Sequence, residues 1–252
     1  MVNEYKIKIV KSGKLIQKYI YSQPLRKGYK IEPNEFKGLI INEETGEVTK
    51  KPKATEKLEK YKNRIINNLV RTINCNVNKR SKFITLTFKE SIQDLETAQK
   101  YFKSFLTAFK REFGFNLEYV AVRERQKKRG LKEHNEGAWH YHLIVFNKQF
   151  LKFERLKKCW SRGSVDVKRI DKVDNIGRYM SKYLWKDIDL IKPGKHSILK
   201  SKGLLKPTVE YLASDIDIKK EPSFSKAWVC LFPNLNGDLV EGLCIMNEYI
   251  DN

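Results

Sequence analysis

The chain has 252 residues, of which 40% are hydrophobic and 12% aromatic, and this is enough apolar material to bury a core, which excludes a disordered tail. Lysine and arginine outnumber aspartate and glutamate by 51 to 30, and the formal net charge of +21 indicates a polyanionic partner, nucleic acid first. No run of about eighteen apolar residues could span a membrane and no N-terminal stretch resembles a signal peptide, so we expect a cytoplasmic protein with no membrane partner.

Cysteine spacing and phosphate-loop motifs narrow the class further. The cysteines lie far apart and without the Cys-x-x-Cys spacing of zinc sites, so we expect reduced core residues and no disulfide framework. They are Cys75, Cys159, Cys230 and Cys244. A phosphate-binding loop would need a glycine at Asp189, before Gly194 and Lys195, so a fused ATP-driven motor is not expected.

The first predicted elements are short strands. Residues 5–10 and 15–21 alternate apolar and polar side chains, which predicts one or two hairpins. A turn-like stretch at 43–47 and a basic linker at 50–53 follow. We therefore treat residues 1–54 as an N-terminal extension.

Periodicity changes after residue 55, where apolar residues recur at steps of three and four and predict helices. The first stripe is Leu58, Tyr61, Ile65, Leu69 and Ile73, and the second is Leu95, Ala98, Phe102, Leu106, Phe109 and Phe113. Gly114 follows the second stripe as a C-terminal stop. Between the stripes, residues 83–88 predict a strand with Phe83, Thr85 and Thr87 on one face.

The remaining elements complete an α+β pattern. Strands are predicted at 117–123, 140–146 and 165–170, and helices at 154–160 and 173–187, with a long basic loop at 125–137. Strands of one mainly antiparallel sheet with helices packed on it would form a domain over residues 55–190. Residues 191–252 give weaker signals and are treated as a C-terminal appendage without an assigned role.

His140 and His142 are the first candidate site residues. Two residues apart on a strand, they point to the same face, where neutral imidazoles can hold a divalent ion and leave positions open for phosphate oxygens. Glu124, at the end of the preceding strand, is the first choice for a carboxylate ligand because a hairpin would place it beside them. Other candidates, in decreasing order, are Glu118, His134 and Glu136. Taken alone, such a histidine pair is more often structural.

Tyr179 and Tyr183 are the second candidate pair. Four residues apart on a helix, they share one face, and Lys182 and Lys186 are placed to stabilise a phenolate or hold a phosphate. Aligned phenols can attack a phosphodiester repeatedly and conserve its bond energy as phosphotyrosine. The alternative is that both tyrosines are core residues of an ordinary helix.

In this order, the motifs resemble those of the rolling-circle replication initiators of bacteriophages and plasmids, nucleases built on a His-hydrophobic-His site. Phe-Ile-Thr-Leu-Thr-Phe at 83–88 is similar to the first motif, His-Tyr-His at 140–142 to the second, and Tyr-Met-Ser-Lys-Tyr at 179–183 to the third. The resemblance covers residues 60–190 and implies an α+β endonuclease domain with a ferredoxin-like core.

The resemblance implies a role for each motif residue. His140, His142 and Glu124 would bind Mg²⁺ or Mn²⁺, Tyr179 would be the first nucleophile, and Lys182 its motif lysine. Tyr183 would be the second nucleophile. The basic residues expected to bind DNA phosphates are Lys127, Lys128, Arg129 and Lys186.

The implied activity is nicking and rejoining of single-stranded origin DNA, alone or exposed in a supercoiled replicon. Attack by tyrosine would leave a 5′-phosphotyrosine and a free 3′-hydroxyl for a host DNA polymerase. A host helicase would unwind the duplex, because no ATPase segment is expected in the chain. The protein would then work in the cytoplasm of the host cell.

Related and unrelated classes remain as alternatives. Conjugative relaxases carry the tyrosine before the histidines, so the motif order disfavours them. Single-strand transposases keep the order but usually have one tyrosine and a shorter chain. A non-catalytic nucleic-acid-binding regulator would use the charge alone, and it predicts that the tyrosine hydroxyls do not converge on the histidines.

Overall fold

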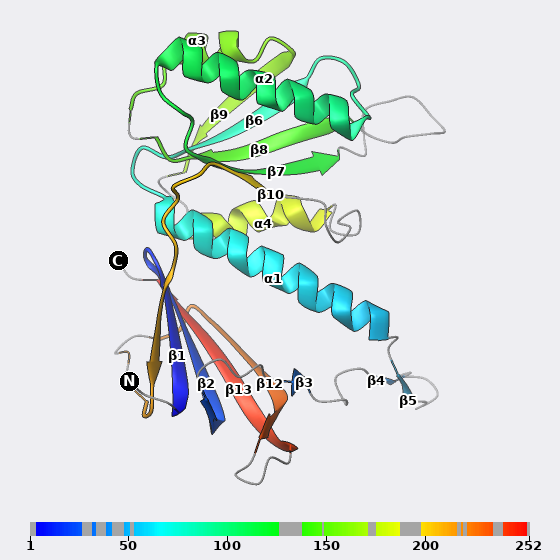
Figure 1. The fold of residues 1–252 in the computed structure, drawn as a ribbon, viewed down its shortest axis with the longest axis vertical. Helices are drawn as coiled ribbons and strands as arrows, with labels where there is room; N and C mark the ends of the chain where they lie inside the picture. Colours follow the sequence, from blue (N-terminus) through cyan, green and yellow to red (C-terminus); the bar gives the residue numbers. More distant parts are fainter. Residues whose placement is uncertain are drawn as a thin grey trace. The chain divides into compact units, whose positions relative to one another are not determined.

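The computed structural model divides the chain into two compact units, Ile66–Lys206 and Met1–Ile65 with Pro207–Asn252. The structure describes residues 4–26, 32–33, 39–41, 48–50, 53–125, 138–147, 149–170, 175–186, 198–215, 218, 221–233 and 239–250. Figure 1 follows the elements in chain order. Among these residues, no helix is long and apolar enough to cross a membrane.

The unit Ile66–Lys206 is built on a five-stranded antiparallel sheet with the order β10-β7-β8-β6-β9. Its strands are β6 (Lys82–Phe88), β7 (Tyr119–Arg125), β8 (Trp139–Val145), β9 (Gly163–Arg169) and β10 (Ile198–Lys200). Its helices are α2 (Leu95–Phe113), α3 (Phe153–Cys159) and α4 (Ile176–Lys186), and α1 (Lys53–Asn76) ends in it. The α+β class and the mainly antiparallel sheet expected from the sequence are confirmed.

One face of this sheet carries the hydrophobic core beneath α2 and α3, as Figure 1 shows. Side chains that alternate along the strands, such as Ile84 and Leu86, are fully buried against this helical layer. The Phe102 ring of α2 stacks on Tyr141 of β8 at 4.4 Å between centroids. Asp94 caps the start of α2 by accepting from the Thr97 amide at 2.7 Å, and Gly114 ends it at φ 79°, as its position predicted.

Because strand side chains alternate, Phe83, Thr85 and Thr87 point to the opposite face of the sheet, as predicted. The final turns of α1 and the start of α4 pack together in this unit: an Asn74 amide hydrogen bonds to Asn175 at 3.0 Å. This second face therefore holds polar and aromatic side chains where the first holds only core.

The other unit contains a six-stranded antiparallel sheet with the order β11-β1-β2-β13-β12-β3. Its strands are β1 (Glu4–Ser12), β2 (Leu15–Arg26), β3 (Glu32–Pro33), β11 (Thr208–Leu212), β12 (Phe224–Pro233) and β13 (Leu239–Ile250), and β4 (Leu39–Ile41) pairs separately with β5 (Val48–Lys50). The predicted first hairpin is confirmed, with Gly13 at φ 59° in its turn.

Strand pairing joins the two ends of the sequence, since β13 lies between β2 and β12. Residues 198–200, beyond the expected endonuclease domain, pair with β7 in the five-stranded sheet. The turn expected at 43–47 lies outside the described residues. The boundaries at 54 and 190 stay predictions of where the endonuclease domain begins and ends.

Candidate active site

The central strand β8 carries both histidines on the face opposite α2. His140 lies directly across from Glu124 of β7, and His142 lies across from Val122. His140 is 8% exposed and His142 6%, so both imidazoles are held within the structure and not displayed on its surface. The alternation of β8 therefore brings the two rings to one partly enclosed face, as the sequence predicted.

Glu124 contacts the histidine diagonal to it. Its Oε2 lies 2.6 Å from Nε2 of His142, and the carboxylate is as buried as the imidazoles, with 8% of the residue exposed. An Nε2–H donating to this carboxylate forms a short, charge-assisted hydrogen bond. The carboxylate chosen from the sequence thus reaches a histidine, and the contact joins the two inner strands β7 and β8 at the site.

Two threonines of β6 contact the other nitrogens of the rings. Oγ1 of Thr85 lies 3.2 Å from Nδ1 of His142, and Oγ1 of Thr87 lies 3.2 Å from Nδ1 of His140. Both pairs sit directly opposite each other in the antiparallel register. With Nδ1 occupied by a hydroxyl, Nε2 is the nitrogen each ring offers to the site.

Helix α4 brings both tyrosines to this face. The Tyr179 and Tyr183 hydroxyls lie 3.0 Å apart, so one donates to the other. The Tyr183 ring stacks on His142 with centroids 4.0 Å apart and planes inclined by 28°. Phe83 contacts both tyrosine rings, at 5.7 and 5.5 Å between centroids. The nucleophile candidates and the histidines therefore share one site.

The environment acts on the phenols differently. Burial raises the pKa of Tyr183 above the usual tyrosine range, and its hydrogen bond with Tyr179, the charge of that neighbour and the nearby Glu124 charge add to the increase. The Lys182 ammonium lies 5.9 Å from the centroid of the Tyr179 ring, and this side chain is exposed. A cation is thus available to Tyr179, while Tyr183 is held neutral by its surroundings.

The position of α4 is set by close contact with α1. A Cβ on Gly177 would lie 2.7 Å from the Val70 carbonyl oxygen and 2.8 Å from the Asn74 side-chain nitrogen, so only glycine permits this approach. Oδ1 of Asn175 accepts from the Arg178 amide and from Asn74, both at 3.0 Å. Asn74 and Asn175 fix the start of the tyrosine helix.

The structure leaves other sequence candidates away from the site. Glu118 is exposed beside the start of β7, at the end opposite Glu124. Lys186 ends α4, but its side chain lies outside what is described. Also outside the described residues are Lys127, Lys128, Arg129, His134 and Glu136. In the described ranges, no group of three or more His, Cys, Asp or Glu side chains is arranged to hold a metal ion, and His142 with Glu124 is the close pair.

Sequence reasoning missed the polar role of Thr85, Thr87 and Asn74. Thr85 and Thr87 were predicted only to share a strand face, although Thr-Leu-Thr has the same two-residue spacing as His-Tyr-His. That matched spacing is a usable signal once the two strands are known to pair. Asn74 gave no signal, because it lies in the apolar stripe of a helix.

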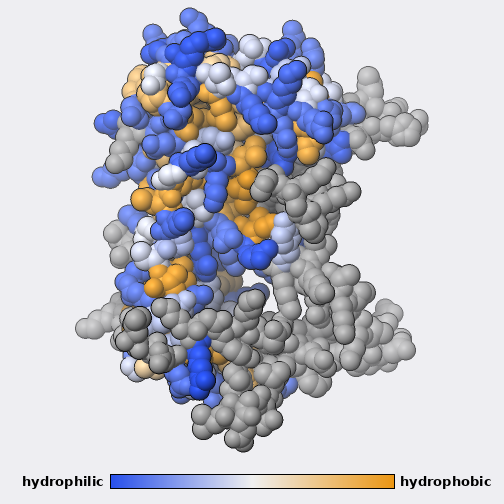
Figure 2. Space-filling model, viewed as in Figure 1, coloured by the Kyte–Doolittle hydropathy of each residue, from blue (hydrophilic) through white to orange (hydrophobic). Residues whose placement is uncertain are grey.

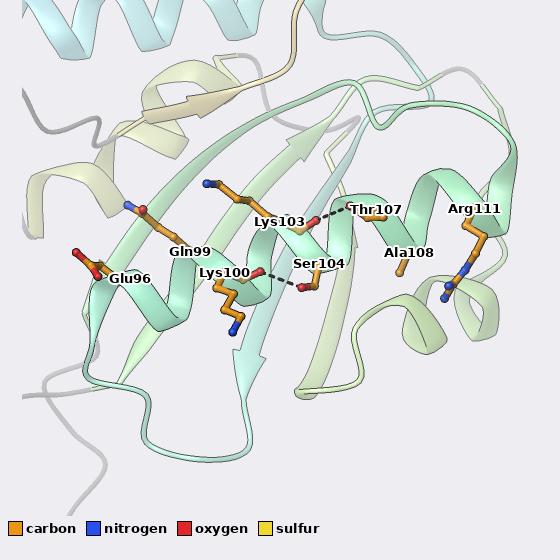
Figure 3. Close-up of a pocket in the computed structure, with 8 residues that line it drawn as sticks. All are labelled: Glu96, Gln99, Lys100, Lys103, Ser104, Thr107, Ala108 and Arg111. Carbon is orange, nitrogen blue, oxygen red and sulfur yellow. Dashed lines mark hydrogen bonds between the residues drawn. The ribbon is translucent and has the colours of Figure 1, made fainter.

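A depression on the outer side of α2 is separate from this site (Figure 3). Its lining residues all belong to that helix: Glu96, Gln99, Lys100, Lys103, Ser104, Thr107, Ala108 and Arg111. The Ser104 and Thr107 hydroxyls donate to carbonyls of their own helix, at 3.0 and 3.1 Å. Figure 2 shows hydrophilic side chains over much of the surface of this unit. We assign this basic helix surface no part in the chemistry.

Fold and site together define an α+β protein with a His-x-His strand and a Tyr-x-x-x-Tyr helix converging on one face of an antiparallel sheet. A family model described as replication-associated protein ORF2 matches residues 81–188. The match begins just before β6 and ends just after α4, so it contains every residue of the converging site except Asn74. It supports a replication-initiator family for this chain. No curated protein and no solved structure matches the chain.

Proposed function

We propose that the chain initiates rolling-circle DNA replication by nicking and rejoining single-stranded origin DNA through a covalent 5′-phosphotyrosine. The observation that carries the proposal is the contact of the Tyr183 ring with His142, at 4.0 Å between centroids, while its hydroxyl meets Tyr179 at 3.0 Å. Helix α4 and strand β8 are separate elements, and ordinary core packing does not require their tyrosines and histidines to meet.

The donor set suits a divalent cation. Nε2 of His142 and the Glu124 carboxylate already lie within 2.6 Å, and His140 points to the same face, so these three would hold Mg²⁺ or Mn²⁺. When bound, such an ion polarises a phosphate oxygen as a Lewis acid. The hydroxyls of Thr85 and Thr87 leave both Nε2 atoms facing the site. The residues present therefore fit the metal that the function needs.

Tyr179 is the first nucleophile in this proposal. Its oxygen forms a bond to the phosphorus as it loses its proton, and the bond from phosphorus to the 3′ oxygen breaks, with that oxygen leaving as a protonated hydroxyl. Lys182, 5.9 Å from the ring, stabilises the negative charge that develops on the phenol. Tyr183 performs the second cleavage, and the free 3′-hydroxyl then rejoins the first strand.

Partners follow from this chemistry. Single-stranded or supercoiled origin DNA is the substrate, and Lys127, Lys128, Arg129 and Lys186 are proposed to contact its phosphates. A host helicase would separate the strands, and a host DNA polymerase would extend the 3′-hydroxyl. With these partners, the protein would act in the cytoplasm of its host cell.

A tyrosine-DNA adduct tests the proposal directly. The purified chain is incubated with Mn²⁺ and labelled single-stranded oligonucleotides that tile the replicon encoding it, and products are separated on a denaturing gel. We expect a slow, protease-sensitive band for the wild type and none for the Tyr179→Phe, Tyr183→Phe double variant. Tyr101→Phe, on α2 across the sheet, is the matched control and should form the band.

The alternatives give different results in the same assay. Adduct formation and nicking that persist in the double variant would contradict tyrosine catalysis. A regulator would bind oligonucleotides without any adduct, and the convergence of the tyrosines on His142 argues against it. A single-strand transposase of the same superfamily would form the adduct but join the strand to new target DNA instead of closing a circle.

A further inference from the structure

We propose that Thr85 and Thr87 are positioning residues that orient the two histidines toward a divalent metal ion. Each hydroxyl would accept a hydrogen bond from Nδ1–H of the histidine across the strand pair, so that Nε2 of both rings faces the ion. The inference rests on the proposed function, because it concerns the same metal site. It adds two residues of β6 to those that determine metal binding.

The first support is that the arrangement occurs twice. Thr85 lies directly across from His142 and Thr87 directly across from His140, and both Oγ1–Nδ1 distances are 3.2 Å. Thr-Leu-Thr on β6 and His-Tyr-His on β8 share the two-residue period of a strand, so each histidine meets one hydroxyl. A single contact of this length could be incidental, whereas two in register indicate a specific pairing of hydroxyls with imidazoles.

The second support is what the aromatic contacts leave undetermined. Phe83 and Tyr183 lie nearly parallel to the His142 ring, inclined by 15° and 28°. Stacking restrains the plane of an imidazole but does not select which ring edge points into the site. The Thr85 hydroxyl contacts one edge only, and it therefore selects Nε2 for the site.

The third support is that a hydroxyl can reverse its hydrogen bond. Without metal, Nε2–H of His142 donates to Glu124 at 2.6 Å, so Nδ1 accepts from Thr85. With an ion on Nε2, the neutral ring carries its one proton on Nδ1, and Thr85 accepts it. The ring keeps one proton and its charge throughout. Hydroxyls donate and accept, whereas a backbone carbonyl or ionised carboxylate can only accept.

Mn²⁺ affinity of the full-length chain measures this role without any DNA substrate. Titration calorimetry is performed with MnCl₂ on the wild type and on Thr85→Val, Thr87→Val, Thr85→Ser and Thr87→Ser. Valine keeps the branched shape and removes only the hydroxyl, so we expect each valine variant to bind Mn²⁺ about 10- to 100-fold more weakly. Serine retains the hydroxyl and should stay within about threefold of wild type.

A second readout separates positioning from general stability. Nitrogen-15 NMR of the imidazoles with Mg²⁺ should show Nδ1–H and unprotonated Nε2 in the wild type, and a mixture of tautomers in the valine variants. Thr107→Val, exposed on α2, is the matched control and should change neither result. Chemical denaturation checks that each variant is folded, and Thr85→Ala and Thr87→Ala replace any valine variant that is not.

The outcomes distinguish this inference from the proposed function. Valine variants that bind Mn²⁺ within about twofold of wild type, with unchanged tautomers, would overturn the role of the hydroxyls and leave the metal site intact. If the wild type does not bind Mn²⁺, or if His142→Ala binds it equally well, the proposed metal site fails and this inference fails with it.

Discussion

Tyr183 combines two contacts that can be separated by mutation. Its ring stacks on His142, and its hydroxyl shares a hydrogen bond with Tyr179. Phenylalanine keeps the ring and removes the hydroxyl, whereas alanine removes both. The pair of substitutions therefore distinguishes a nucleophile from a residue that holds a metal ligand in place.

We expect Tyr183→Phe to retain first-strand nicking within about tenfold of wild type, because the stack on His142 remains and Tyr179 performs this step. Rejoining into circles should be lost. Tyr183→Ala should lose both activities, since His142 also loses its stacking partner. The measurement is a time course of nicked and circular products from one oligonucleotide set. Equal loss of nicking in both variants would show that the hydroxyl is needed for the first cleavage.

Tyr141 gives a residue-scale prediction for stability. It is fully buried between strands and α2, and its hydroxyl has no hydrogen-bond partner among the described residues. An unsatisfied buried hydroxyl is costly, so Tyr141→Phe should raise the free energy of unfolding by about 1 kcal/mol. Urea denaturation at neutral pH checks this, with the half-buried Tyr101→Phe as control. A decrease would mean that the hydroxyl is satisfied in solution.

The same residue predicts a pH dependence. Burial raises the pKa of Tyr141, against a smaller opposing effect of the Arg123 charge. The folded state therefore holds this proton more tightly than the unfolded chain, whose tyrosines titrate near about 10. The resulting stabilisation is fully present below that pH and is lost above it. We expect urea midpoints to fall less between about pH 9 and 11 in Tyr141→Phe than in wild type. Equal decreases would contradict the shift.

At the scale of elements, local periodicity predicted most of the endonuclease unit. The stripe ending at Phe113, the stop at Gly114 and the two faces of β6 appear where the sequence placed them. Register was harder to predict, because it depends on contacts between strands that are far apart in sequence. Glu124 was correctly expected beside the histidines, but its diagonal contact with His142 needed the three-dimensional pairing.

Gly177 tests the placement of α4 against α1. Alanine normally favours a helix by up to about 1 kcal/mol over glycine, so propensity alone predicts stabilisation. Here the new Cβ would lie 2.7 Å from the Val70 carbonyl oxygen, and we expect Gly177→Ala to destabilise by about 1–3 kcal/mol instead. Nicking should also fall, because the tyrosines move from His142. Urea denaturation and the adduct assay measure these effects.

The exposed Arg178→Ala on the same helix is the control for that substitution, and its folding stability should stay within about 0.5 kcal/mol of wild type. A Gly177→Ala variant that is more stable than wild type and equally active would show that α1 and α4 separate without consequence. The tyrosine helix would then be positioned by the sheet alone.

At the scale of the whole molecule, the charge of +21 predicts a strong salt dependence of DNA binding. The Tyr179→Phe, Tyr183→Phe variant allows binding to be measured without cleavage, by fluorescence anisotropy of a labelled single-stranded oligonucleotide. If about six phosphates are contacted, affinity should fall on the order of 100-fold between 50 and 200 mM KCl. Sucrose of equal osmolarity is the control. An affinity independent of salt would exclude a phosphate-dominated interface.

Composition indicated this partner class, but not the second sheet. Residues 191–252 gave only weak signals, although β11, β12 and β13 all join β1 and β2. Their pairing depends on partners near the other end of the sequence, which no local pattern contains. The basic loop residues Lys127, Lys128 and Arg129 lie outside the described residues, so their role stays a prediction.

That pairing has a consequence for how the chain is made. Gln17 of β2 donates to Glu248 of β13 at 2.8 Å, across 231 positions of sequence. A ribosome delivers residues at about 5–20 per second, so the first hairpin waits for its central partner until nearly the whole chain has emerged. The strands and helices of residues 82–186 are complete earlier. Vectorial synthesis thus allows the nuclease half to fold first, while β1 and β2 stay dependent on the last strand translated.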